Sequence, residues 1–173
     1  MKSRSAAALF LLATLLWAKG DLVVVEVQGG ALTTPLKITD PKIQDFNIWA
    51  GPGVNGATTK DAKGFIIDWQ AGVAAHLPAG LQHYEISFYE GCRIPNDWCR
   101  AEKPSLAYVV FYDYDPASQR GFVYLPGKGE PWYAMNVRSI WHGDDAEGHW
   151  FQASDSWEGF VRPIIANALS RNR

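Results

Sequence analysis

The sequence has no run of lysine or arginine, and this absence excludes two classes of partner. Its 16 basic residues are scattered among 18 acidic ones, which gives a net charge of −2. Nucleic acids and anionic membrane surfaces are bound by concentrated positive charge. We therefore expect no nucleic-acid partner, and the partners left to consider are a protein, a peptide or a glycan.

Catalytic and cofactor motifs are also missing. No G-x-S-x-G sequence offers a serine nucleophile. The glycine-rich stretch at residues 50–56 lacks the spacing and the lysine of a phosphate-binding loop. Internal repeats, low-complexity segments and long linkers are absent as well. The sequence predicts one globular, aromatic-rich domain at residues 21–173 with no cofactor, and it favours a non-enzymatic role without deciding the question.

Long apolar runs are confined to the N-terminus. Lys2 and Arg4 precede an apolar stretch at residues 6–18, which has the length of a signal-peptide core and is too short to span a membrane. Ala18 and Gly20 fit a cleavage site, so residues 1–20 are predicted to be a signal peptide and the mature chain to be a secreted or periplasmic bacterial protein. Because this leader takes three of the 16 basic residues and no acidic one, 13 basic and 18 acidic residues remain, a net charge of −5.

Cysteine is scarce. Cys92 and Cys99 are the only two, and they flank a Pro-Asn-Asp turn signal. Two thiolates alone make a poor zinc site, whereas an even pair in an exported protein usually forms a disulfide. We predict a disulfide between these two residues, across one connection of a sheet.

Aromatic and β-branched residues, in contrast, are abundant, and their pattern predicts an antiparallel meander. Three such runs are separated by turn-forming clusters, at residues 83–90, 106–114 and 121–125. In the first run Tyr84, Ile86 and Phe88 alternate with polar residues, so one face is expected to be buried. The second run is apolar on both faces, which suits a central strand. Further strands are predicted at residues 22–27, 35–39, 65–69 and 132–141.

Helical signals lie outside this meander. Asp40 followed by Pro41 predicts a short helix. Near the C-terminus, apolar residues recur with helical spacing: Trp157, Phe160, Val161, Ile164, Ile165, Ala168 and Leu169. Asp155 is expected to cap this helix and Pro163 to kink it. The predicted fold class is α+β, a mainly antiparallel sheet of five to seven strands with the C-terminal amphipathic helix packed on one face.

The densest group of ionisable side chains lies in a glycine-containing loop at residues 142–149. It comprises His142, Asp144, Asp145, Glu147 and His149. Imidazole and carboxylate groups can hold a divalent metal, although this spacing matches neither the H-E-x-x-H motif nor a calcium loop. The loop is therefore a weak metal or binding candidate, and Trp141 and Trp150 at its ends are expected to be core anchors of a hairpin.

Two further sets of residues suit a site. His83 is a candidate base, and a carboxylate pair for hydrolysis could come from Asp68, Glu85, Asp113 and Asp115, because such a pair is defined by its separation in space. Rings at or near turns suit a binding surface: Tyr89, Trp98, Tyr112, Tyr114, Trp132 and Tyr133. No catalytic set stands out, so the expected function is an exported, non-enzymatic binding or interaction module. The alternative is a hydrolase or metal-dependent enzyme that uses the His142–His149 loop.

Overall fold

A computed structural model describes residues 20–46, 66–91, 103–140 and 146–171 of the chain. Its centre is a six-stranded antiparallel sheet with the order β2-β1-β3-β4-β5-β6. The strands are β1 (Asp21–Gly29), β2 (Leu36–Ile38), β3 (Gln82–Gly91), β4 (Ser105–Asp115), β5 (Arg120–Leu125) and β6 (His149–Gln152). The predicted α+β class is confirmed.

The strands β3, β4 and β5 form the predicted meander. Ile86 lies opposite Val110 on β4, and Tyr112 of β4 lies opposite Val123 on β5. The strand β4 is thus central, in agreement with its apolar residues on both faces. On the other side of β3, Val27 of β1 pairs with Ile86, and β1 also forms a hairpin with the short strand β2.

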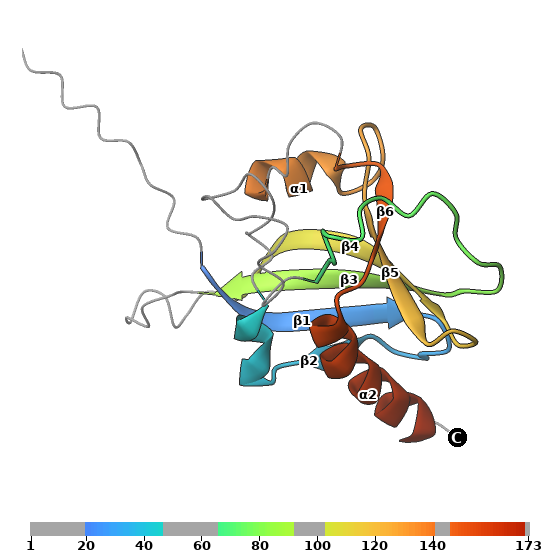
Figure 1. The fold of residues 1–173 in the computed structure, drawn as a ribbon. Coiled ribbons are helices and arrows are strands. Elements are labelled where there is room, and N and C mark those ends of the chain that lie inside the picture. The colour runs from blue at the N-terminus through green and yellow to red at the C-terminus, as the bar shows by residue number, and fades with distance from the viewer. Residues whose placement is uncertain (1–19, 47–65, 92–102, 141–145, 172–173) are drawn as a thin grey trace, which may run out of the picture.

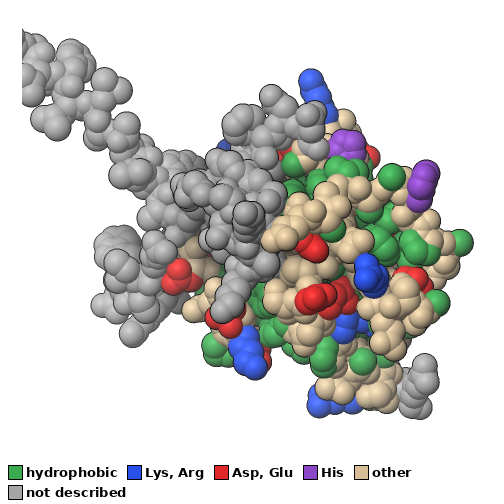
Figure 2. All heavy atoms as spheres, viewed as in Figure 1, with side chains coloured by type: hydrophobic (Ala, Val, Ile, Leu, Met, Phe, Trp, Pro, Cys, Tyr) green, Lys and Arg blue, Asp and Glu red, His purple; other side chains and the backbone are tan. Residues whose placement is uncertain are grey.

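One face of the sheet is covered by α2 (Asp155–Arg171) and by the 3₁₀ helix η1 (Pro41–Asp45). Tyr84, Ile86 and Phe88 point to this face and are fully buried, as their alternation predicts. The indole of Trp157 on α2 packs on the ring of Phe88, with 5.9 Å between the ring centroids. Figure 1 shows α2 crossing in front of the strands, so we call this side the covered face. On the view of this side in Figure 2, acidic and basic side chains are interspersed.

The helix α2 begins as expected but with a different cap. The hydroxyl of Ser154 accepts a hydrogen bond from the backbone N–H of Trp157 at 3.2 Å, so Ser154, not Asp155, supplies the capping side chain. Trp157, Val161 and Ile165 form the buried stripe. The helix continues through Pro163 to Arg171.

The prediction of a strand at residues 132–141 is wrong, because α1 (Tyr133–Ser139) is a helix. The half-buried Tyr133 and Val137 and the buried Ile140 are spaced four and three residues apart, which is helical periodicity. The predicted strand at 65–69 is also wrong over its described part, residues 66–69. There the chain makes only an isolated bridge between Ile67 and Ala153.

That isolated bridge belongs to a segment that lies along the outer edge of the sheet. The backbone N–H of Asp68 donates to the carbonyl of Gln152 at 2.9 Å, and the N–H of Ala74 donates to the carbonyl of Trp150 at 2.7 Å. Unpaired edge strands invite pairing with other chains. Residues 66–74 therefore protect the edge strand β6.

The predicted signal peptide and the predicted disulfide stay predictions. Residues 1–19, as well as Cys92 and Cys99, lie outside the described residues. Within the described ranges, no helix is both long enough and apolar enough to cross a membrane.

Candidate functional site

The face of the sheet opposite α2, which we call the open face, carries a row of aromatic side chains across four neighbouring strands. The row consists of His83 on β3, Phe111 on β4, Tyr124 on β5 and Trp150 on β6. Ring centroids lie 5.4 Å apart for His83 and Phe111, 6.2 Å for Phe111 and Tyr124, and 4.9 Å for Tyr124 and Trp150. Because successive rings are in contact, the four form one continuous surface, which we call the ring row.

Register explains this arrangement. Phe111 lies directly opposite Tyr124, and Tyr124 lies directly opposite Trp150. Directly opposed residues project from the same face of an antiparallel sheet. Their neighbours Tyr112, Val123 and Phe151 therefore point to the covered face, where all three are buried. The rings of the row are only partly buried, and the side chain of His83 is 59% exposed.

Carboxylates stand beside the ring row, each held by hydrogen bonds. The imidazole Nδ1 of His83 lies 2.5 Å from Oδ1 of Asp113. The hydroxyl of Tyr124 donates to both oxygens of Glu130, at 2.9 and 3.0 Å, and Gly127 N–H also donates to Glu130. Each carboxylate has about four acceptor positions. The rings and carboxylates are thus fixed in place while acceptor capacity remains for a ligand.

The helix α1 and the residue before it border one side of this surface. Trp132 has a left-handed backbone with φ 71°, and its indole N–H donates to Glu85 at 3.1 Å. Glu85 also accepts from the side-chain amide of Gln28 at 2.7 Å. At 36% exposure, Trp132 is among the most exposed large apolar residues described. It therefore adds another aromatic side chain to the open face, bonded to Glu85.

A buried amide attaches α1 to the sheet. The strand β5 ends at Leu125, so β4 has no partner strand on that side beyond Phe111. There the side chain of Asn136 accepts from the backbone N–H of Val109 at 3.0 Å and donates to the carbonyl of the same residue at 2.6 Å. This one side chain replaces a strand at that point, and it fixes the position of α1 and of Trp132.

Neighbouring carboxylates affect two tyrosines of the open face. Burial raises the pKa of Tyr89, and the nearby carboxylates of Glu26 and Glu85 raise it further. Burial and the bond to Glu130 raise the pKa of Tyr124 to about 12. Both shifts disfavour the phenolate form of these two tyrosines.

The covered face holds a polar cluster of a different kind. Tyr112 donates its hydroxyl to Glu158 on α2 at 2.7 Å, and the guanidinium of Arg162 lies over the ring of Tyr114 at 3.2 Å from its centroid. Burial raises the pKa of Glu158, although Tyr112 and Arg162 oppose the shift. These contacts lie between α2 and the sheet, so they attach the helix.

The loop predicted as a metal or binding candidate is described only in part. His142, Asp144 and Asp145 lie outside the described residues. Glu147 is half-buried in a turn, and the exposed His149 opens β6 opposite Leu125. Over the described part of the chain, no three His, Cys, Asp or Glu side chains gather as metal ligands. Trp150, expected in the core, is half-buried on the open face, and the buried neighbour is Phe151.

The other sequence candidates do not all meet at one place. His83, Asp113 and Glu85 share the open face. Asp115 is buried and accepts from the Ser118 hydroxyl and the Ala117 N–H, whereas Asp68 caps a turn beside β6. Among the ring candidates, Trp132 and Tyr89 contribute to the open face, Tyr112 is buried, Tyr114 lies under Arg162, Tyr133 is half-buried on α1, and Trp98 lies outside the described residues.

Sequence reasoning missed Phe111, Tyr124 and Trp150 as a group. Each stands within a strand and not at a turn, and the signal that could have found them is their alternation with buried neighbours. Comparison with protein-family models, curated proteins and solved structures finds no match to this chain. The function is therefore inferred from the geometry of the described residues.

Proposed function

We propose that this protein is an exported, non-enzymatic binding module and that the open face of its sheet binds a glycan. The observation that carries the proposal is the ring row, which is continuous over four strands and has hydrogen-bonded carboxylates beside it. A sugar ring has an apolar C–H face that stacks on aromatic rings and hydroxyl donors at its rim. The partly exposed rings can stack on the C–H face of the sugar, and the carboxylates of Glu85, Asp113 and Glu130 can accept hydrogen bonds from its hydroxyl groups.

Rigidity supports this assignment. Binding is weakened when flexible side chains must be ordered. Here each ring contacts its neighbour, and the Tyr124 hydroxyl and the Trp132 indole are already bonded to carboxylates. The surface is thus arranged before a ligand arrives. The excess of acidic over basic residues also fits a neutral ligand better than an anionic one.

The test is binding of the purified protein to immobilised neutral and acidic oligosaccharides, followed by titration with the best neutral binder. Trp150→Ala and Tyr124→Ala remove rings of the row, each worth about 1 kcal/mol of contact, so roughly fivefold weaker binding is expected. The control is Phe160→Ala, which removes a partly buried ring from the covered face. The proposal is contradicted if the protein binds none of the oligosaccharides, or if Phe160→Ala weakens binding as much as the two ring-row variants do.

The alternative, a hydrolase or metal-dependent enzyme that uses the His142–His149 loop, stays a sequence-based prediction. Most of that loop's candidate ligands lie outside the described residues. Metal analysis of the purified protein before and after chelation, with thermal unfolding of both samples, tests it separately from glycan binding. A stoichiometric metal whose removal lowers the unfolding midpoint would favour the alternative.

A further inference from the structure

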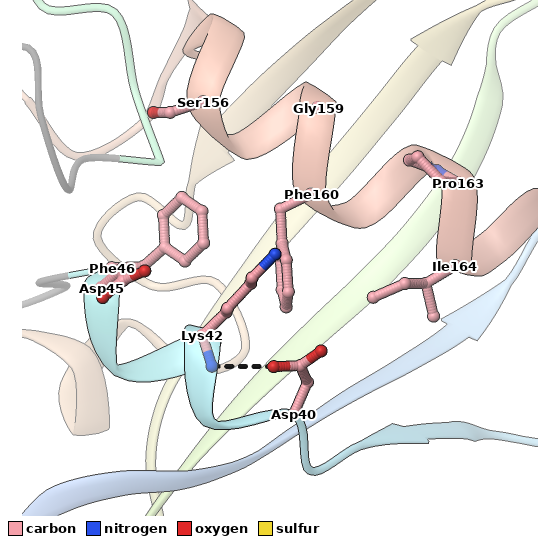
Figure 3. Close-up of a pocket in the computed structure, with 9 residues that line it drawn as sticks. All are labelled: Asp40, Lys42, Asp45, Phe46, Ser156, Gly159, Phe160, Pro163 and Ile164. Carbon is pink, nitrogen blue, oxygen red and sulfur yellow. Dashed lines mark hydrogen bonds between the residues drawn. The ribbon is translucent and has the colours of Figure 1, made fainter.

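A groove of about 770 Å³ runs between η1 and the first half of α2, on the covered side of the molecule and away from the ring row. Its apolar walls are Phe46 next to η1, together with Phe160, Pro163 and Ile164 on α2. Figure 3 shows both phenylalanine rings directed toward the space between the two helices. Ligand sites are typically concave and largely apolar, with a few polar groups and volumes of about 300–1,000 Å³. This groove has the size and the composition of such a site.

The wall formed by α2 contains the two residues that suit a helix interior least. Gly159 and Pro163 stand four residues apart, so both face the groove. A Cβ atom placed on Gly159 would meet nothing within 4 Å, so packing does not require glycine there. A larger side chain would project into the groove. The glycine therefore keeps the groove open without contributing to the fold.

Pro163 has a second effect on this wall. Proline has no backbone N–H, so it cannot donate the helical hydrogen bond that the carbonyl of Gly159 would otherwise accept. The carbonyl of Gly159 thus lacks its usual donor on the stretch of α2 that lines the groove.

The charged groups at the rim favour a cation. Asp40 and Asp45 contribute two carboxylates and Lys42 one ammonium group, so the rim has an excess of negative charge. One oxygen of Asp40 accepts from the backbone N–H of Lys42 at 2.9 Å, the bond drawn in Figure 3. Over the described residues, no ion pair joins Lys42 to either carboxylate. Both carboxylates therefore keep acceptor capacity for a ligand.

From these observations we infer that the groove between η1 and α2 is a second binding site, which takes an amphipathic amine. The apolar body of the ligand lies along the wall formed by the contacting rings of Phe46 and Phe160 and by Ile164. Its protonated amine lies at the rim, within reach of Asp40 and Asp45. This site is independent of the glycan surface, because the two lie on opposite faces of the sheet.

The experiment compares three probes with the same alkyl chain, octylamine, octanol and octanoate, by calorimetric titration of the full-length protein at pH 7. Octylamine is cationic at this pH, octanol neutral and octanoate anionic. Octylamine is expected to bind at least threefold more tightly than octanol, and octanoate most weakly. Asp45→Asn should reduce the preference for octylamine over octanol by roughly threefold, and Lys42→Gln should increase it.

The location of the site is tested by Gly159→Leu, which fills the groove from α2 with a residue that favours helix. The matched control is Ala166→Leu, which adds the same side chain at an exposed position of α2 outside the groove. Gly159→Leu should abolish octylamine binding, and Ala166→Leu should leave it unchanged. The inference would be overturned if octanoate bound as tightly as octylamine or if no probe bound. It would also be overturned if Gly159→Leu bound octylamine as tightly as the wild type. The Trp150→Ala variant should bind octylamine normally, which separates this test from that of the glycan surface.

Discussion

Replacing Asn136 with leucine should destabilise the protein strongly, although the two side chains have the same number of heavy atoms and the same branching. Asn136 is 2% exposed, and its amide satisfies both the N–H and the carbonyl of Val109. Leucine makes neither bond, and the two backbone groups would stay buried without a partner. Each such group costs about 1–3 kcal/mol. After allowance for the greater burial of apolar surface by leucine, we expect a loss of about 2–4 kcal/mol in the free energy of unfolding.

Urea unfolding followed by tryptophan fluorescence measures this loss. With a denaturant slope of about 2 kcal/mol per molar, the unfolding midpoint should fall by roughly 1–2 M. Asn167→Leu is the control, because Asn167 is exposed on α2. A midpoint shift for Asn136→Leu no larger than that of the control would refute the role assigned to this amide.

Asn136→Asp provides a second, sharper comparison. Its carboxylate can still accept from the N–H of Val109, but a charged oxygen would face the carbonyl of the same residue. A protonated carboxyl group could donate there, so the folded state should raise the pKa of this new side chain above its unfolded value. Stability should therefore recover as the pH is lowered toward 4, in contrast to Asn136→Leu. Equal pH dependence of the two variants would contradict the bidentate geometry.

Three further outcomes are expected. Burial raises the folded-state pKa of Glu158 above its ordinary value of 4.5, so the free energy of unfolding of the wild type should fall as the pH rises above 4.5. Glu158→Gln keeps an acceptor for Tyr112, and urea titrations from pH 4 to 7 should show no such fall for this variant. Gly159→Ala should raise the free energy of unfolding by about 1 kcal/mol, since the added Cβ meets open space, and a destabilised variant would show that glycine is required there. Glu130→Gln should lower the pKa of Tyr124 from about 12, and an unchanged absorbance titration at 295 nm would be evidence against the bond between them.

The sequence predicts the sheet well where one face is buried and the other is wet. The alternation of Tyr84, Ile86 and Phe88 set the face of β3, and the two-sided apolar run placed β4 in the centre. The helix α1 was mistaken for a strand because aromatic and β-branched residues suit a sheet, and Asn136, the residue that holds the helix in place, is polar. A buried asparagine whose partner is a strand edge gives no periodic signal.

The site was harder to predict, for a related reason. A ring at a turn was taken as a candidate for exposure, yet Tyr112 is buried and Tyr124 is not. Which side of a strand is open depends on where α2 packs, and that is a property of the whole fold. The groove between η1 and α2 joins segments more than a hundred residues apart, so only Pro163, unusual within a helical pattern, marked it in the sequence.

The strand order has a consequence for how the chain folds. The strands β3, β4 and β5 are consecutive in sequence and adjacent in the sheet, whereas β1 must pair with β3 across all the residues between Gly29 and Gln82. Closing a long loop costs more conformational entropy than closing a hairpin, and non-local contacts slow folding. The central meander is therefore the natural folding nucleus, and the docking of the N-terminal strand is a later step that completes the sheet.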